Sequence, residues 1–128
     1  MIIDDEPDFL ETIVKRLKKR KLDAVGVGSG EEGLRAIEEQ AFDVIILDVR
    51  MPGMDGIETL KEIKKKSPLT EVIMLTGHAS VESGMHGMRL GAFDYVIKPA
   101  DIEELIEKVN QAGERKTLHE ERIGKSEH

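Results

Sequence analysis

The stretch VIILD at residues 44–48 decides how this sequence is expected to fold. It contains a run of apolar, mostly β-branched residues that ends in Asp48, with Pro52 and Gly53 following shortly after. A short apolar run bounded by turn residues is typical of a strand that is buried on both faces. We therefore expect a parallel sheet with helices packed on both sides.

Similar runs lie on both sides of this stretch, at Met1–Ile3, Ala24–Val27, Val72–Leu75 and Tyr95–Ile97. Between these runs, apolar residues recur at helical spacing, as in the series Leu10, Ile13, Val14 and Leu17. Strand and helix thus alternate along the chain, which indicates right-handed crossovers between parallel strands. The sequence predicts an α/β fold: a doubly wound, five-stranded parallel sheet with strand order 2-1-3-4-5, the flavodoxin-like (βα)5 arrangement.

Composition limits the classes of function. The chain has 128 residues, 39% hydrophobic and 35% charged, which suits one globular domain, and it has no cysteine for disulfides or thiolate metal sites. A net charge of −7 argues against direct nucleic-acid binding by this domain. No apolar stretch has the length of a membrane span and the start lacks the features of a signal peptide, so we expect a cytoplasmic protein with no membrane contact.

Both ends of the sequence depart from the regular pattern. The first strand has only three residues before Asp4, so we expect the numbered chain to begin inside its natural first strand. Residues 113–128 contain only two sizeable apolar residues, Leu118 and Ile123, and their charges balance. We therefore expect a domain over residues 1–112, followed at 113–128 by a charged tail, either frayed helix or the start of a linker.

Polar residues stand where the predicted strands end. Asp4 and Asp5 follow the first strand, Asp48 ends the third, Thr76 the fourth and Lys98 the fifth. In an open parallel sheet these ends meet at one edge, where ligands bind. Carboxylates gathered there repel one another unless a cation intervenes, and hard oxygen ligands suit Mg²⁺ or Mn²⁺. With a lysine and a hydroxyl alongside, this chemistry predicts a site that holds a phosphoryl group on Asp48.

Four motifs carry a resemblance to a known family: IIDDE (2–6), ILDVRMPGMDG (46–56), MLTGHA (74–79) and DYVIKP (94–99). In this order and spacing the sequence resembles the receiver domain of two-component response regulators over roughly residues 1–112. The resemblance implies that Asp48 accepts a phosphoryl group from a sensor histidine kinase or a histidine phosphotransfer protein. The domain would then change its surface to signal to an output domain or partner, acting as a switch and not as a turnover enzyme.

The resemblance also assigns metal ligands. Asp5 and Asp48 would bind Mg²⁺ directly, Asp4 would act largely through water, and Arg50 would contribute its backbone carbonyl.

Further roles follow from the same resemblance. Thr76 and Lys98 would hold the phosphoryl oxygens, and Tyr95 would turn inward as a switch when Thr76 moves. Arg50 and His78 would tune the lifetime of the phosphoryl group. The Lys98-Pro99 peptide bond would be cis. A homodimer, if one forms, would use the surface made by the helix before the fifth strand, that strand and the last helix.

Structural roles and other functions are alternative interpretations of these residues. Asp48 could serve a strand-end turn, and Asp5 could cap the helix that begins near Pro7. A phosphohydrolase would commonly carry a second acid at the position of Arg50, which argues against turnover. A degenerate receiver is not supported, because the expected site residues are all present.

Two further patterns each have a functional and a structural interpretation. Residues 28–33, GSGEEG, match a dinucleotide-binding fingerprint, but their two glutamates would repel a pyrophosphate, and a turn before a helix explains them better. The basic run within residues 15–21 is either a solvated helix end or a docking edge for a partner, and we favour the first.

Overall fold

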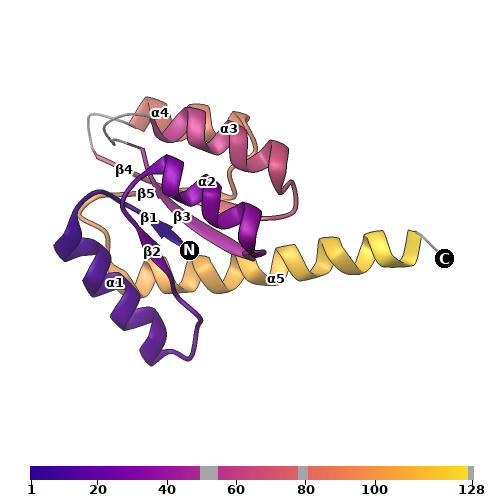
Figure 1. Cartoon of the computed structure of the whole chain (residues 1–128), viewed down its shortest axis with the longest axis horizontal. Helices are drawn as coiled ribbons and strands as arrows, with labels where there is room; N and C mark the ends of the chain where they lie inside the picture. The colour runs from indigo at the N-terminus through magenta and orange to yellow at the C-terminus, as the bar shows by residue number, and fades with distance from the viewer. Residues whose placement is uncertain (50–54, 78–80, 127–128) are drawn as a thin grey trace.

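Strands and helices alternate along the chain in the computed structural model, which describes residues 1–49, 55–77 and 81–126. Figure 1 shows the arrangement. The strands are β1 (Ile2–Ile3), β2 (Gly26–Val27), β3 (Val44–Asp48), β4 (Glu71–Thr76) and β5 (Asp94–Ile97). The helices are α1 (Pro7–Lys19), α2 (Gly30–Glu39), α3 (Gly56–Lys66), α4 (Val81–Arg89) and α5 (Ile102–Ser126).

All strand pairs are parallel, and the five strands form one sheet in the order β2-β1-β3-β4-β5. The predicted fold class and strand order are therefore confirmed. β1 is short, but its pairing reaches Met1, whose amino group donates to the carbonyl of Val44 at 2.9 Å.

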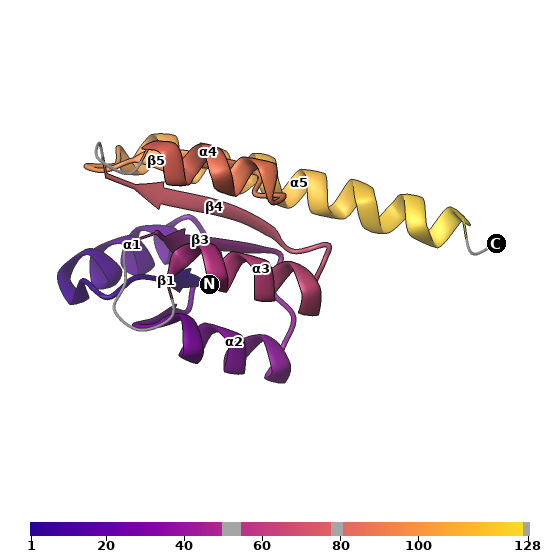
Figure 2. The ribbon, with the colours of Figure 1, turned by 90° about the horizontal axis from the view of Figure 1, so that it is seen from above.

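The alternation of side chains along β3 divides the core into two layers. Ile45 and Leu47 pack in a cluster with residues of α3 such as Leu60, whereas Ile46 packs with residues of α1 and α5 such as Ile13. Figures 1 and 2 show the result: α2, α3 and α4 cover one face of the sheet, and α1 and α5 cover the other. The central strands are buried on both faces, as their continuous apolar runs predicted.

The glycine-rich stretch before α2 is a helix start. Ser29 is the N-cap residue, and its hydroxyl accepts from the backbone N–H of Glu32 at 3.2 Å. The Glu32 carboxylate in turn accepts from the N–H of Gly28 at 2.9 Å. This pair is similar to a capping box, except that the backbone donor belongs to the residue before the N-cap. A glutamate already uses the backbone donor that a pyrophosphate would need, which supports the structural interpretation of GSGEEG.

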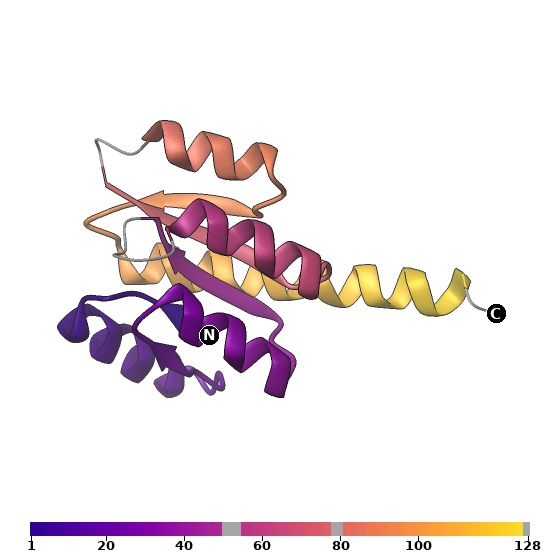
Figure 3. The same cartoon turned by 45° about the horizontal axis from the view of Figure 1, so that its top comes forward.

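α5 continues well past the sheet (Figures 2 and 3). Just beyond Gly113, Lys116 donates to Asp43 at 2.8 Å, and the Arg115 guanidinium lies 3.7 Å from the Glu71 carboxylate. Asp43 precedes β3 and Glu71 begins β4, so both acids lie at the opposite end of the sheet from Asp48 and Thr76. The expected tail is therefore helical through Ser126, while a domain boundary at residue 112 remains a prediction.

A close approach of backbones explains why a glycine begins α3. A Cβ atom at Gly56 would lie 2.5 Å from the Cα of Val49 and 2.8 Å from the carbonyl oxygen of Asp48. The backbone N–H of Gly56 also donates to the carbonyl of Val49 at 3.1 Å. α3 can approach the end of β3 this closely only because residue 56 has no side chain.

Gly56→Ala is expected to lower the free energy of unfolding by about 1–3 kcal/mol, because the backbone beside Asp48 must shift. Gly113→Ala is the matched control, since a Cβ there would lie 4.0 Å from Val44 and fits. In the interior of α5 it should raise stability by about 0.5–1 kcal/mol. Urea unfolding measures both values, and a neutral Gly56→Ala would contradict the packing described.

Candidate functional site

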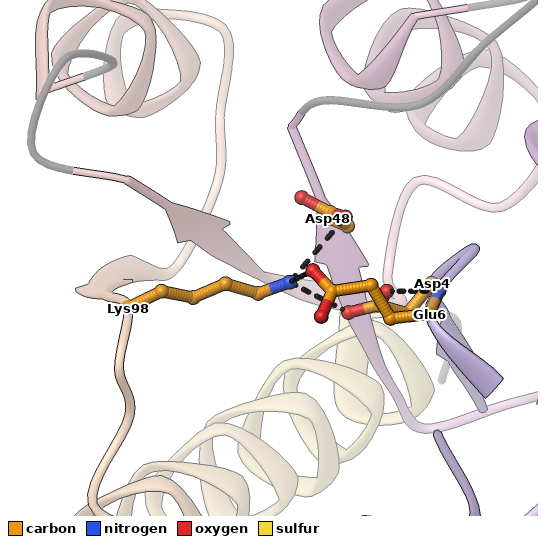
Figure 4. A network of polar contacts seen from close by, with 4 residues as sticks. All are labelled: Asp4, Glu6, Asp48 and Lys98. Carbon is orange, nitrogen blue, oxygen red and sulfur yellow. Dashed lines mark hydrogen bonds and ion pairs between the residues drawn. The ribbon is translucent and has the colours of Figure 1, made fainter. Parts of the chain in front are cut away.

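The carboxyl ends of three strands place their polar residues together. Asp4 follows β1, Asp48 ends β3, and Lys98 follows β5. Because β4 separates β3 from β5, the lysine side chain reaches past the end of β4 to meet the two aspartates. Figure 4 shows its ammonium group among the carboxylates.

The Lys98 ammonium contacts three acids. Its Nζ lies 3.0 Å from Asp4 Oδ2, 3.0 Å from Glu6 Oε1 and 3.5 Å from Asp48 Oδ2. The ring of Phe9 lies on α1 with its centroid 4.9 Å from Nζ, close enough for a cation–π contact. The lysine is thus held by contacts from β1, α1 and β3.

This environment favours the charged lysine. Burial opposes the charge, but hydrogen bonds to Asp4 and Glu6 and the charge of Asp48 outweigh it and raise the pKa of Lys98. The lysine therefore stays protonated throughout the physiological range, as a residue that neutralises added negative charge must.

Asp4 and Asp5 differ sharply in position. The Asp4 side chain is fully buried, and its Oδ1 accepts from the N–H of Glu6 at 2.9 Å. The Asp5 side chain is exposed. The structure therefore brings Asp4, and not Asp5, into contact with Lys98, and the role of Asp5 as a direct metal ligand remains a prediction.

Glu6 is a site residue that sequence reasoning missed. It is the N-cap residue of α1, ahead of Pro7, so Asp5 does not cap this helix. The side chain of Glu6 does not cap it either and points instead to Lys98 (Figure 4). The only signal in the sequence was its place directly after the two aspartates.

Carboxylate oxygens of Asp4, Glu6 and Asp48 lie within 4.8 Å of one another. Among the described residues, this is the group of acids that could share a metal ion. Hard oxygen donors at the edge of a sheet, two of them buried, fit a hard divalent cation such as Mg²⁺. The predicted donor chemistry is therefore present, although Glu6 takes the place in this group that was expected for Asp5.

Thr76 is buried at the end of β4, with 1% of its surface exposed. Its Oγ1 has no hydrogen-bond partner within the part of the chain that the structure describes. A buried hydroxyl normally has a partner, because leaving it unpaired costs about 1–3 kcal/mol. An unpaired donor at this edge is available for an oxygen of a bound group.

Tyr95 is half-buried on β5 and packs against the apolar cluster beneath α2, α3 and α4. Thr76 comes two residues after Met74, which belongs to the same cluster, so strand alternation places Thr76 and Tyr95 on one face. This fits the expected pairing of the two residues. The Lys98-Pro99 peptide bond is cis, as the resemblance implied.

Two predicted residues cannot be placed. Arg50 and His78 lie outside the described residues, so their expected roles, including the backbone carbonyl of Arg50 as a metal ligand, stay predictions.

Comparison with known proteins decides the family. The sequence matches the family described as response regulator receiver domain over residues 1–110. The chain is a receiver domain of this family. The resemblance found in its sequence motifs is thus confirmed, and with it the function of receiver in two-component signalling, which is to accept a phosphoryl group.

The receiver domain is similar to parts of larger regulators. It is 37% identical over 111 residues to the DNA-binding transcriptional regulator NtrC of Klebsiella pneumoniae, covering 87% of this chain and 24% of that protein. It is 37% identical over 105 residues to the transcriptional regulatory protein ZraR of Escherichia coli K12, covering 82% and 24%. The chain thus spans about a quarter of the length of these curated relatives.

Solved structures agree with the fold. The receiver domain of NtrX from Brucella abortus matches with a TM-score of 0.84 and 30% identity, over 88% of this chain and 96% of that one. A response regulator receiver domain protein from Clostridium thermocellum matches with a TM-score of 0.87 and 38% identity, over 91% and 94%. Within the described residues, no helix is long and apolar enough to cross a membrane.

The Thr76 hydroxyl can be tested against a hydrogen-bonded hydroxyl at the other end of β4. Thr70 precedes β4, and its Oγ1 donates to the carbonyl of Phe42 at 2.7 Å. Thr70→Val should lower the free energy of unfolding by about 1–2 kcal/mol, whereas Thr76→Val should leave it unchanged or raise it by up to about 1 kcal/mol. Chemical denaturation of the two variants measures the difference, and equal losses would show that the Thr76 hydroxyl is bonded.

Proposed function

We propose that this receiver domain accepts a phosphoryl group on Asp48 from a phosphohistidine, carried by a sensor histidine kinase or a histidine phosphotransfer protein. The observation that carries the proposal is the Lys98 ammonium, held 3.5 Å from the Asp48 carboxylate at the edge of the sheet. The buried hydroxyl of Thr76 at the neighbouring strand end, which has no hydrogen-bond partner among the described residues, supports it. A nucleophile, a cation and a free donor are what an aspartyl-phosphate site requires.

The transfer depends mainly on neutralising the negative charge of the phosphoryl oxygens. An Asp48 carboxylate oxygen attacks phosphorus, an O–P bond forms, and the N–P bond to the donor histidine breaks, with its electron pair returning to the imidazole. The negative oxygens of the phosphoryl group then need positive charge and hydrogen-bond donors. Lys98 supplies the charge, and Thr76 turns its hydroxyl toward one of the oxygens.

A divalent cation completes the proposed site. Asp4, Asp5, Asp48 and the backbone carbonyl of Arg50 would hold Mg²⁺ or Mn²⁺, Asp4 largely through water. The bound ion would supply charge neutralisation for the phosphoryl oxygens. The buried carboxylates of Asp4 and Asp48 support this assignment, and the exposed Glu6 carboxylate lies close enough to influence it.

The signal would pass from Thr76 to Tyr95. If the Thr76 hydroxyl moves to the phosphoryl group, space opens beside it on the face covered by α2, α3 and α4, and Tyr95 turns into that space. Arg50 and His78 would set the lifetime of the phosphoryl group. In this scheme the domain catalyses at most its own phosphorylation and dephosphorylation.

The proposal extends to the surroundings of the domain. Residues 1–112 would form the receiver and 113–128 the start of a connection to an output domain, in the cytoplasm. A homodimer would use the face of α4, β5 and α5. NtrC is described as a DNA-binding regulator, so the output domain of a longer protein would bind DNA. This acidic domain itself would not bind DNA.

Intact mass after incubation with acetyl phosphate and Mg²⁺ tests the acceptor. Wild-type protein should gain one phosphoryl group, and Asp48→Asn or added chelator should abolish the gain. Asp43→Asn is the matched control, because Asp43 precedes the same strand at its opposite end and pairs with Lys116. It should be modified like the wild type. Folded wild-type protein that gains nothing would contradict the proposal.

Mg²⁺ affinity distinguishes the predicted metal ligands from other acidic residues. Asp5→Asn and Asp48→Asn should each weaken Mg²⁺ binding about tenfold or more, as loss of a metal-site group does. Asp23→Asn removes the same charge from an exposed position and should change the affinity less than about twofold. Calorimetric titration measures these constants, and an Asp5→Asn protein with wild-type affinity would remove Asp5 from the ligand set.

A further inference from the structure

The side chain of Glu6 has an unusual orientation for its place in the fold. An N-cap side chain ordinarily accepts a hydrogen bond from the first turn of its helix. Glu6 makes no such bond, and its carboxylate instead accepts from Lys98 at 3.0 Å, although the side chain is 63% exposed. α1 thus begins without a side-chain cap, and the group that could cap it contacts Lys98.

The Lys98 ammonium lies closer to two of its three neighbouring carboxylates than to the third. An ammonium group has three N–H donors, and three carboxylates surround this one. The distances to Asp4 and Glu6 are 3.0 Å each, whereas that to Asp48 is 3.5 Å, at the limit of a hydrogen bond. Phe9, also on the α1 side, adds a contact between its ring and the ammonium. Glu6 and Phe9 therefore draw the lysine toward α1 and away from the acid that ends β3.

We propose that Glu6 is a positioning residue. It restrains the Lys98 ammonium on the α1 side and so keeps this charge farther from the Asp48 carboxylate. The inference rests on the proposed role of Asp48 as phosphoacceptor. Glu6 touches neither the reacting oxygen nor the phosphoryl group in this scheme and acts through the lysine alone. Without its charge, Lys98 is left with Asp4 and Asp48 and moves closer to the acceptor.

Phosphorylation rates at saturating Mg²⁺ test the proposal in five proteins: wild type, Glu6→Gln, Glu11→Gln, Lys98→Gln and the Glu6→Gln/Lys98→Gln double variant. Glu6→Gln should react with acetyl phosphate about two- to fivefold faster than wild type, the scale of one exposed ion pair. Glu11→Gln, the matched control, removes an equal charge from the same helix, where Glu11 pairs only with Lys15 among the contacts described, and should keep the wild-type rate. In a Lys98→Gln background, the effect of Glu6→Gln should disappear. A rate in Glu6→Gln equal to that of wild type or of Glu11→Gln, or an equal gain without Lys98, would overturn the proposal.

Mg²⁺ affinity separates this role from direct metal binding. A positioning residue that loses one exposed charge should weaken Mg²⁺ binding less than about threefold. A fall of about tenfold or more, the same with and without Lys98, would mark Glu6 as a ligand and overturn the proposal.

A crystal structure of the Glu6→Gln variant shows the position of the Lys98 ammonium directly and does not depend on phosphorylation. The Nζ of Lys98 should lie nearer to Asp48 Oδ2 than the 3.5 Å found here. An unchanged or longer distance would overturn the proposal. If wild-type protein takes up no phosphoryl group, the proposed function fails, while this structure still decides whether Glu6 restrains Lys98.

Discussion

The positive charge of Lys98, shared by Asp4 and Asp48, holds together the edge of the sheet where the site lies. Asp4 and Asp48 are buried, and two buried carboxylates are costly unless something positive lies between them. Lys98 provides that charge from a position 94 residues away from Asp4 and 50 residues away from Asp48. The contact can form only when β1, β3 and β5 are all in register in the same sheet. The fold and the site therefore depend on each other.

The alternation of side chains along the strands separates the charged residues of the site from the residues proposed to respond to phosphorylation. Asp4, Asp48 and Lys98 each come two residues after a residue of the cluster formed with α1 and α5, namely Ile2, Ile46 and Val96. Thr76 comes two residues after Met74 of the opposite cluster, against which Tyr95 also packs. The charged network and the proposed switch therefore belong to opposite faces of the sheet. Thr76 lies where they meet, and its backbone carbonyl accepts from the N–H of Lys98 at 2.6 Å.

Much of this arrangement could be predicted from the sequence. Continuous apolar runs predicted buried parallel strands, and the residue types at the strand ends predicted where Asp48, Thr76 and Lys98 would gather. Strand alternation also contained a signal for Asp4 over Asp5, because Asp4 shares its face with Ile2 and the lysine shares its face with Val96. The structure shows that Asp4, and not Asp5, contacts Lys98, while the direct metal-ligand role expected for Asp5 stays a prediction.

Other features depend on tertiary contacts that a sequence pattern does not encode. Glu6 is a helix N-cap residue, and nothing local tells whether its side chain turns to the helix or to a lysine far away in the sequence. The helical state of residues 113–126 also depends on distant partners, since Arg115 and Lys116 pair with acids at the starts of β4 and β3. The low apolar content of that segment indicated a tail, but these ion pairs hold its first turn against the sheet.

Identifying the residue that carries the phosphoryl group tests the central claim most directly. Reduction of phosphorylated protein with borohydride converts an aspartyl phosphate to homoserine, and trypsin releases residues 36–50 as one peptide. This peptide contains both Asp43 and Asp48, so its fragment ions distinguish the two ends of the same strand. We predict homoserine at position 48 and aspartate at position 43. Conversion at position 43, at Asp4 or at Asp5, with Asp48 intact, would contradict the assignment of Asp48 as the phosphoacceptor.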